Sequence, residues 1–282
     1  MRVVVTGGSG KLGRAVVDEL ATHGHDVANV DAAPPRDARS AFTRIDLTDF
    51  GQVVEAFSRI DSRYDSVDAV VHLAAIPGPG NAPNAATFAN NVVGTYNVFA
   101  AARAAGIRNV VWASSETVLG LPFDEPPPYL PVDEEVPLRP ATTYSLGKVL
   151  DEEMARQFCR WDPELKMIGL RFSNVMEPAD YAQFSAWNDD PSIRRWNLWS
   201  YIDARDGAQA VRRALEHEAR GMDVFIIANA DTVMSRPNEE LVRATFPDVP
   251  IRRPLGEHDT LLSIEKAQRV LGYAPAHSWR NA

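Results

Sequence analysis

The chain of 282 residues is long enough for one large α/β domain, or for a nucleotide-binding domain with a small second lobe. Its formal net charge of -9 excludes a general nucleic-acid binder, because phosphate contacts need clustered Lys and Arg. The single cysteine, Cys159, can form neither an intramolecular disulfide nor a zinc cluster. We therefore expect a cytoplasmic protein without a metal site.

No targeting or membrane segment is predicted. Met1 and Arg2 lead directly into three valines, a run too short for the apolar region of a secretory signal peptide. The sequence holds no run of eighteen apolar residues, so no transmembrane helix is expected. These features predict a soluble protein with no membrane partner.

The first half of the chain alternates strand and helix patterns. The residues at 69–74 are almost wholly apolar, as in a strand that is buried on both faces of a parallel sheet. Such alternation predicts a parallel sheet with helices on both faces and right-handed connections. Strands are predicted at 2–6, 27–31, 42–46, 69–74 and 109–114, and helices at 11–23, 50–59 and 85–105, the last ended by Gly106.

The regular pattern breaks at 121–140, where seven prolines predict a surface loop. A helix at 142–160 and a strand at 166–172 follow, and the pattern is less regular after Asn174. A helix at 204–217, a strand at 224–227 and two short helices complete the chain. The predicted fold is a Rossmann-type doubly wound parallel sheet with a small C-terminal substrate lobe. We place the Rossmann domain at 1–172 and the lobe at 173–282, with segments that return to the core.

A glycine-rich turn joins the first strand to the first helix. Gly7, Gly10 and Gly13 permit a tight turn, close approach of a pyrophosphate and close packing of the helix on the strand. The helix N-terminus that follows offers unpaired N–H groups to the phosphates. Because this turn follows an N-terminal strand and opens an amphipathic helix, it predicts a dinucleotide site.

Asp31 closes the second strand, eighteen residues after Gly13. A carboxylate there can accept hydrogen bonds from the ribose hydroxyls and would repel a 2′-phosphate, which favours NAD over NADP. An ordinary turn aspartate is the alternative interpretation. Arg14 and Arg36 also leave NADP open.

Tyr144 and Lys148 lie four residues apart on the helix after the proline-rich segment, so both project from one face. An ammonium group beside a phenol stabilises the phenolate, which can then take a proton from an alcohol as hydride leaves its carbon. Taken alone, such a spacing also describes an ordinary surface pair.

The motifs together resemble the extended short-chain dehydrogenase/reductase superfamily, also called the NAD-dependent epimerase/dehydratase family. They run in the family's order from residue 6 to residue 275. The matching segments are Thr6-Gly7-x-x-Gly10-x-x-Gly13, Asp46-Leu47, His72-Leu73-Ala74-Ala75, Asn90-Asn91-Val92-x-Gly94-Thr95, Ala113-Ser114-Ser115, Tyr144-x-x-x-Lys148, Arg171-Phe172-x-Asn174-Val175 and a C-terminal stretch from Ser263 to Pro275.

The resemblance implies a role for each matching residue. Ser115 would orient the substrate oxygen, Tyr144 would be the acid/base, and Lys148 would also bind the nicotinamide ribose. Ser115 as a turn residue and Asn91 as a structural contact remain alternatives. The implied cofactor residues are Gly7, Gly10, Lys11, Leu12, Gly13, Asp31, Asp46, Leu47, Leu73, Ala74, Ala75, Asn91, Tyr144 and Lys148, and the implied substrate residues are Ser115, Glu116 and Asn174.

Departures from the family pattern reduce the number of candidate activities. Gly147 stands where Ser or Thr usually precedes the catalytic lysine. The Asp-Glu pair of sugar-nucleotide 4,6-dehydratases is replaced by Glu116 and Thr117, which disfavours dehydration. Only 26 residues separate Asn174 from Tyr201, fewer than nucleotide-sugar enzymes usually use.

A weaker resemblance is to the compact uronate dehydrogenases. It rests on Glu177-Pro178-x-x-Tyr181, Ser185-x-Trp187 and Asp189-Asp190. Those enzymes place an arginine for the substrate carboxylate in this segment, where this chain has Ala182-Gln183-Phe184. Arg194 and Arg195 could meet a charged group, or form a solvated basic turn.

Three functions stay open. The first is a dehydrogenase of a free sugar or sugar acid, the second a sugar-nucleotide epimerase or reductase, and the third a non-enzymatic cofactor sensor. Retention of the Tyr144/Lys148 pair favours an enzyme. The resemblance also implies a homodimer through the helices that carry Asn91 and Tyr144. Alanines at 100, 101 and 104 would allow close helix contact there, although they would suit packing on the sheet equally well.

Overall fold

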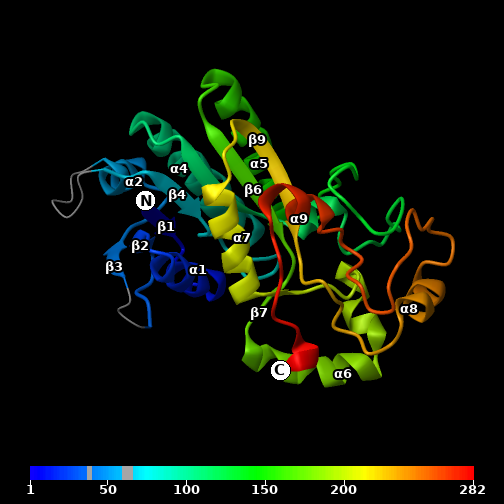
Figure 1. Ribbon diagram of the computed structural model, residues 1–282. Coiled ribbons are helices and arrows are strands. Elements are labelled where there is room, and N and C mark those ends of the chain that lie inside the picture. Colours follow the sequence, from blue (N-terminus) through cyan, green and yellow to red (C-terminus); the bar gives the residue numbers. More distant parts are fainter. Residues whose placement is uncertain (37–39, 59–65) are drawn as a thin grey trace.

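The computed structural model describes residues 1–36, 40–58 and 66–282, and its core is one parallel sheet of seven strands (Figure 1). The strand order is β3-β2-β1-β4-β5-β6-β9, and every pairing is parallel. This confirms the predicted Rossmann-type α/β fold. The strands are β1 Arg2–Thr6, β2 Asp26–Asp31, β3 Ala41–Arg44, β4 Ala69–His72, β5 Asn109–Ser115, β6 Lys166–Phe172 and β9 Gly221–Ile227.

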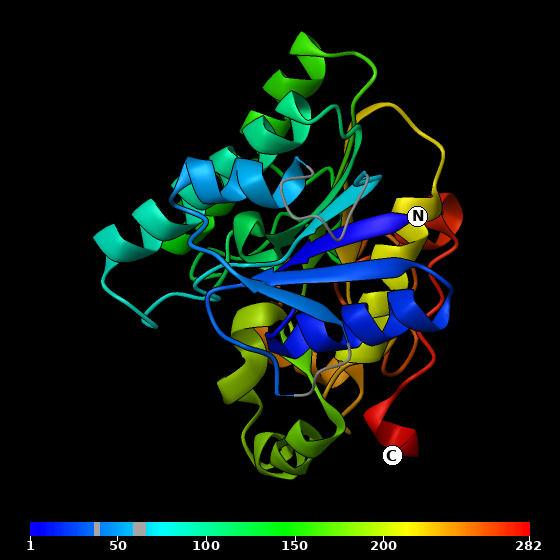
Figure 2. The same cartoon turned by 90° about the vertical axis from the view of Figure 1, so that its left-hand side faces the viewer.

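Helices cover both faces of the sheet (Figure 2). One face carries α1 and α7, which pack on each other, and the other carries α2, α4 and α5. The predicted end of α2 at residue 59 lies outside the described residues. The helices are α1 Lys11–Thr22, α2 Phe50–Phe57, α3 Asn84–Phe88, α4 Gly94–Ala104, α5 Thr143–Trp161 and α7 Ala204–Glu216.

Burial explains why the central strands are mostly apolar. All four residues of β4 and all seven of β6 are buried. A strand that has helices on both faces has no solvated side, so it lacks the alternation of polar and apolar residues. Strands β2 and β3 are added on one side of β1, and the chain then returns to add β4 on its other side. In doubly wound sheets this switch point is where a crevice opens at the carboxyl ends of the strands.

The predicted long helix at 85–105 is three helical segments in succession. A π-helical segment, η1 Ala89–Val93, lies between α3 and α4. Such segments are rare and often mark functional positions. Gly106 follows α4 with a φ of 74°, a conformation that glycine adopts without strain.

The proline-rich segment at 121–140 is irregular, as predicted, but its assignment as a surface loop holds only in part, because exposed residues such as those at 124–126 alternate with buried ones. Tyr129, Leu130 and Val132 are buried. The backbone N–H groups of Leu130 and Val132 donate to the carbonyls of Pro250 and Leu261 at 2.9 Å each. The prolines exclude a regular strand, yet isolated backbone hydrogen bonds still anchor the segment in the core.

The region after β6 builds a second layer beneath the sheet. β7 Val175–Met176 pairs with β8 Ile202–Asp203, and Phe184 is the centre of an aromatic cluster. The division of the chain at residue 172 stays a prediction. The remaining elements are the 3-10 helices η3 Pro178–Gln183 and η4 Pro191–Asn197, and the α-helices α6 Phe184–Asp189, α8 Asn238–Thr245 and α9 Glu265–Leu271.

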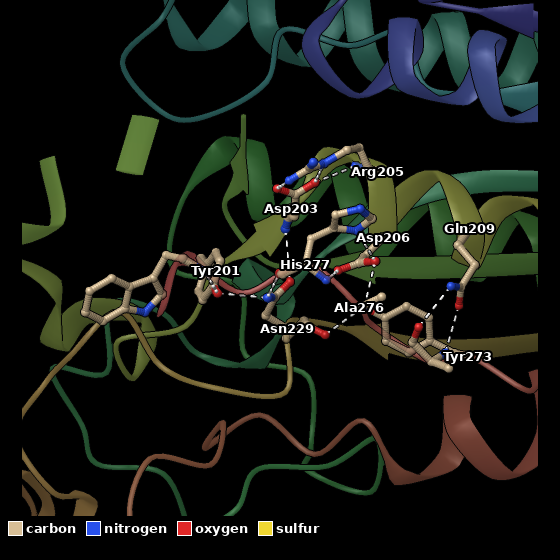
Figure 3. Close-up of polar contacts among 12 residues, drawn as sticks. Tyr201, Asp203, Arg205, Asp206, Gln209, Asn229, Tyr273, Ala276 and His277 are labelled. Atoms are coloured by element: carbon tan, nitrogen blue, oxygen red, sulfur yellow. Dashed lines mark hydrogen bonds and ion pairs between the residues drawn. The ribbon is translucent and has the colours of Figure 1, made fainter. Parts of the chain in front are cut away.

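Asp206 on α7 holds the last residues of the chain against the sheet (Figure 3). Its buried carboxylate accepts hydrogen bonds from the backbone N–H groups of Ala276 and His277, at 3.0 and 2.9 Å. Asn229 donates to the His277 carbonyl. In the part of the chain that the structure describes, no helix has the length and apolar character needed to cross a membrane.

Candidate active site

A cavity of about 1200 Å³ opens at the carboxyl ends of the strands, at the switch point. It extends from the glycine-rich turn to the start of α5. Almost all of the predicted site residues line it, namely Gly7, Gly10, Lys11, Leu12, Gly13, Asp31, Asp46, Leu47, Leu73, Ala74, Ala75, Ser115, Glu116, Tyr144, Lys148 and Asn174.

The glycine-rich turn is packed too tightly for a side chain at Gly7 or Gly13. A Cβ on Gly13 would lie 2.1 Å from the Gly7 carbonyl oxygen, and one on Gly7 would lie 2.5 Å from the backbone nitrogen of Ala74. Gly10 precedes α1 without a side-chain cap, so the first N–H groups of the helix face the cavity. These features suit a pyrophosphate group.

Asp31 lies at the end of β2 and lines the same end of the cavity. Its Oδ2 accepts from the Ser9 N–H at 3.0 Å and its Oδ1 from the Ala33 N–H at 3.2 Å. The carboxylate therefore fixes the glycine-rich turn as well as facing the cavity. Arg36 also lines this end.

Asn91 does not line the cavity, unlike the other predicted cofactor residues. Its side chain is buried and hydrogen-bonds both backbone groups of Ile76: Oδ1 accepts from the N–H at 2.8 Å and Nδ2 donates to the carbonyl at 3.1 Å. Ile76 itself lines the cavity, beside Ala75. Asn91 thus supports the cavity wall from behind. This contact agrees with the alternative interpretation of Asn91 as a structural residue.

His72 is a supporting residue to which the sequence analysis assigned no role. Its Nδ1 lies 2.7 Å from Oγ1 of Thr6 and its Nε2 lies 3.1 Å from Oγ1 of Thr95, so it links β1, β4 and α4. Burial lowers the pKa of His72 to about 3, which keeps the ring neutral.

Tyr144 and Lys148 project into the cavity from the first turns of α5, which Thr142 and Ser145 cap reciprocally. The ammonium nitrogen of Lys148 lies 6.0 Å from the centre of the Tyr144 ring. It donates to the Ala113 carbonyl at 2.8 Å, and Oδ2 of Asp151 lies 3.3 Å away.

Burial alone would lower the pKa of Lys148, but the charges of Asp151 and Tyr144 outweigh it and the pKa is raised. The ammonium group therefore stays charged inside the protein. Asp151 was not among the predicted site residues, although it lies three positions after the lysine on the same helix.

Ser115 ends β5 and lines the cavity near Tyr144. Its hydroxyl oxygen accepts from the N–H of Thr117 at 3.2 Å, so it also caps the short helix η2 Glu116–Leu119. Ser115 is therefore a turn residue, as the alternative interpretation has it, and it also lines the cavity.

Glu116 follows Ser115 and is only 2% exposed. Its Oε1 accepts from Nδ2 of Asn197 at 3.2 Å. Burial raises the pKa of Glu116 to about 7, against the opposing effects of Ser173, Asn197 and Arg194. The carboxyl group is thus neutral in a substantial fraction of molecules near neutral pH.

Arg194 is not a solvated basic turn, which was one of its two predicted environments. It is 5% exposed, and its guanidinium lies over the rings of Trp187 and Trp196 at 4.5 and 5.0 Å from their centres. It donates to Oδ1 of Asn174 at 2.8 Å. Arg194 therefore orients a cavity residue without lining the cavity itself.

Comparison with known proteins agrees with this geometry. A model of the NAD dependent epimerase/dehydratase family matches residues 3–228. UDP-glucose 4-epimerase 2 of Oryza sativa subsp. japonica is 31% identical over 219 residues, which is 71% of this chain but only 50% of that relative. L-arabinose 1-dehydrogenase (NAD(P)(+)) of Haloferax volcanii is 28% identical over 284 residues, covering 97% of this chain and 96% of the relative.

Among solved structures, a short-chain dehydrogenase/reductase superfamily protein from Agrobacterium tumefaciens with bound NAD superposes with a TM-score of 0.74 at 25% identity. The match covers 99% of this chain and 94% of the other. The fold is thus shared over 99% of this chain.

Proposed function

The chain belongs to the NAD dependent epimerase/dehydratase family, and from this premise we propose that it is an NAD(P)-dependent oxidoreductase that acts on a hydroxyl carbon of a sugar or sugar acid. The single observation that carries the proposal is the shared cavity. One continuous cavity joins the glycine-rich turn, which suits a pyrophosphate, to Tyr144 and Lys148, which suit proton transfer.

The residues present fit a dinucleotide. The glycines of the turn would let a pyrophosphate approach the backbone N–H groups, and Asp31 would accept hydrogen bonds from the ribose hydroxyls. Asp46 and Leu47 would contact the adenine, and Leu73 to Ala75 would lie under the cofactor. The Asp31 carboxylate at the cavity wall supports NAD, while Arg36 on the same wall keeps NADP open.

Bound NAD(P)+ would supply the acceptor for the hydride that leaves the substrate carbon. Tyr144 would take the proton of the substrate hydroxyl on its phenolate oxygen, so that the alcohol becomes a carbonyl. Lys148, kept charged by Asp151, favours the phenolate electrostatically. Ser115 would hold the substrate oxygen by a hydrogen bond, and reduction would reverse each proton movement.

Dehydrogenation is the first candidate because only 26 residues separate Asn174 from Tyr201, fewer than nucleotide-sugar enzymes usually use. Relatives matched over more than 90% of their length include both a sugar dehydrogenase and a UDP-glucose 4-epimerase. Epimerisation at a sugar-nucleotide carbon is the second candidate, since it uses the same Tyr144 chemistry and occurs among the relatives. A cofactor sensor is disfavoured because the tyrosine and lysine are both in place at the cavity.

The decisive experiment replaces Tyr144 by Phe. We expect kcat to fall by about three orders of magnitude or more, since proton transfer and its positioning are lost, with NAD(P)H affinity nearly unchanged. Reduced-nicotinamide absorbance measures turnover, and fluorescence titration measures cofactor binding. Tyr129→Phe is the matched control, because that tyrosine lies outside the cavity. Full turnover by the Tyr144→Phe enzyme would refute the assignment.

We also propose a homodimer and a cytoplasmic location. Exposed apolar side chains at Val93, Tyr96, Leu146 and Trp161 lie on η1, α4 and α5, which pack on one another (Figure 1). An apolar patch of this kind supports a protein interface. The buried, unpaired Cys159 supports a reducing compartment.

A further inference from the structure

A chain of buried polar side chains runs behind the cavity wall from the glycine-rich turn to Lys148. Its members, each at most 2% exposed, are Thr6 on β1, His72 on β4, Thr95 on α4 and Asp151 on α5. The His72 ring contacts the hydroxyl groups of Thr6 and Thr95, at 2.7 and 3.1 Å. Thr95 is also a side-chain hydrogen-bond partner of Asp151, whose Oδ2 lies 3.3 Å from Nζ of Lys148. The chain thus connects three other elements of the fold to α5.

The hydrogen bonds of this chain have one direction, because each hydroxyl group has a single proton to donate. A carboxylate only accepts, so the Thr95 hydroxyl donates to Asp151 and its oxygen accepts from Nε2–H of His72. The neutral ring then accepts at Nδ1 from the Thr6 hydroxyl, whose oxygen accepts from the N–H of Ala74 at 3.4 Å. Every donor of the chain therefore points toward the Asp151 carboxylate and stabilises it as an anion.

Asp151 lies beside the ammonium group and far from the phenol. Tyr144, Lys148 and Asp151 occupy one face of α5, at positions i, i+4 and i+7. Two helical turns, about 10 Å along the axis, separate Asp151 from Tyr144. Its negative charge therefore holds the proton of the ammonium group more strongly than it opposes the phenolate. The Ala113 carbonyl, which accepts from Nζ at 2.8 Å, fixes the ammonium group as well.

We propose that Asp151, supported by Thr95 and His72, is a positioning residue for proton transfer, because it keeps the buried ammonium group of Lys148 charged and in place for Tyr144. The inference rests on the proposed function and adds the residues through which the lysine acts. Lys148 is only 3% exposed, so water cannot replace a lost counter-charge. Without the carboxylate, the lysine loses its proton more readily, and the phenolate loses the positive charge that favours it.

The other titratable groups around this ion pair do not replace Asp151. On α5, Glu152 is engaged by Arg171 of β6 through two hydrogen bonds of 2.9 Å. On β4, His72 is neutral, since burial lowers its pKa to about 3. Burial raises the pKa of Asp151 to about 6, against the opposing charge of Lys148. A titration that starts at about pH 7 therefore finds Asp151 ionised.

The first test titrates Tyr144 in the full-length protein with NAD+ and without substrate. The tyrosinate absorbance of Tyr144 is the difference between wild type and Tyr144→Phe from about pH 7 to about pH 10.5, and the same difference is measured in an Asp151→Asn background. We expect the midpoint of this signal at least about one pH unit higher in the Asp151→Asn background. An unchanged or lower midpoint, or no Tyr144 signal in the wild type within this range, overturns the inference.

Glu153→Gln is the matched control for the loss of a carboxylate. Glu153 lies on the same helix, but its side chain is 50% exposed and its partner is the exposed Arg156. The midpoint of the control should equal that of the wild type, because water screens an exposed charge. Circular dichroism at each pH restricts the comparison to folded protein. A shift in Glu153→Gln as large as that in Asp151→Asn would contradict a specific role of Asp151.

Thr95→Val tests the chain behind Asp151 while the carboxylate stays in place. The substitution keeps the shape of the side chain and removes the hydroxyl group that joins Asp151 to His72. We expect a midpoint shift in the same direction as that of Asp151→Asn, and smaller, because one hydrogen bond is lost and the charge remains. An unchanged midpoint would remove Thr95 and His72 from the proposal.

Turnover distinguishes this inference from the proposed function. The sugars used are L-arabinose, D-galactose and D-galacturonate, with NAD+ as the hydride acceptor. For a sugar that is oxidised, Asp151→Asn should lower kcat at about pH 8 by at least about tenfold, with a much smaller change in KM. A midpoint shift without oxidation of any sugar would uphold the role of Asp151 and count against the dehydrogenase. Loss of turnover in Tyr144→Phe, together with wild-type behaviour of Asp151→Asn, would support the dehydrogenase and refute the role of Asp151.

Discussion

The position of Lys148 could be predicted from the sequence, whereas its contacts could not. Its position, four residues after Tyr144, was readable from the sequence because helical periodicity puts both on one face. Its contacts with Ala113 and Asp151 were not, because they depend on how α5 lies on β5. Similarly, the sequence placed Glu116 next to Ser115, but only its burial in the folded chain reveals its raised pKa, which the contact with Asn197 and the charge of Arg194 oppose.

Glu116→Gln should change the pH dependence of stability in the ligand-free protein. The pKa of Glu116 in the folded state is about 7, above its ordinary value, so its favourable contribution is complete at low pH and is lost as pH rises through 7. The glutamine variant does not undergo this loss. We expect equal free energies of unfolding below about pH 4.5, and a variant more stable by up to about 3 kcal/mol at pH 8.

Urea denaturation at a series of pH values measures this difference. Glu55→Gln, which alters an exposed carboxylate, should follow the wild type throughout. A constant difference between Glu116→Gln and wild type across the series would contradict the raised pKa.

Most elements were predictable because their patterns are local. β6 and the start of α1 occur where the sequence predicted them, since a mostly apolar strand and a glycine turn before an amphipathic helix are strong signals. The segment at 121–140 was in part misjudged as surface, because proline content reports on backbone regularity and not on burial. The apolar side chains of Tyr129, Leu130 and Val132 were the sequence signal for its buried part. The π-helical segment η1 had no recognised sequence signal.

Gly13→Ala tests the contact between α1 and β1. The added Cβ would lie 2.1 Å from the Gly7 carbonyl oxygen, so α1 must move away from the turn. We expect NAD affinity to fall by about tenfold or more, and stability by about 1–3 kcal/mol. Fluorescence titration and thermal unfolding measure the two effects.

Ala15→Gly, on the same helix, is the control. It costs about 1 kcal/mol through helix propensity without a steric clash. Cofactor affinity should survive in this variant. If Gly13→Ala bound NAD as tightly as Ala15→Gly does, the turn would not be the pyrophosphate site.

At the scale of the whole molecule, the alanines of α4 lie in two environments, the packing against the sheet and the exposed surface. Ala101 is buried against the sheet, whereas Ala104 is exposed. The exposed aromatic rings near them are continuous, because Phe158 contacts both Tyr96 and Trp161. The sequence could not distinguish an interface from sheet packing at these positions, since both favour small residues.

The proposed dimer predicts a solution mass of twice 31.1 kDa by size-exclusion light scattering. Tyr96→Glu combined with Leu146→Glu should give a monomer, because each places a charge in an apolar interface. Ile251→Glu alters an equally exposed apolar residue away from α4 and α5, and it should leave the mass unchanged. A wild-type mass equal to one chain would exclude the dimer.

The pairing of β9 with β6 has a consequence for synthesis of the protein on the ribosome. Until residues 221–227 emerge, β6 presents an open, largely apolar edge whose N–H and C=O groups have no neighbour on that side. Such an edge is a template for pairing with other chains. During synthesis the sheet therefore lacks its last strand, β9, for a long interval. Cellular factors that shield exposed strands would act during that interval.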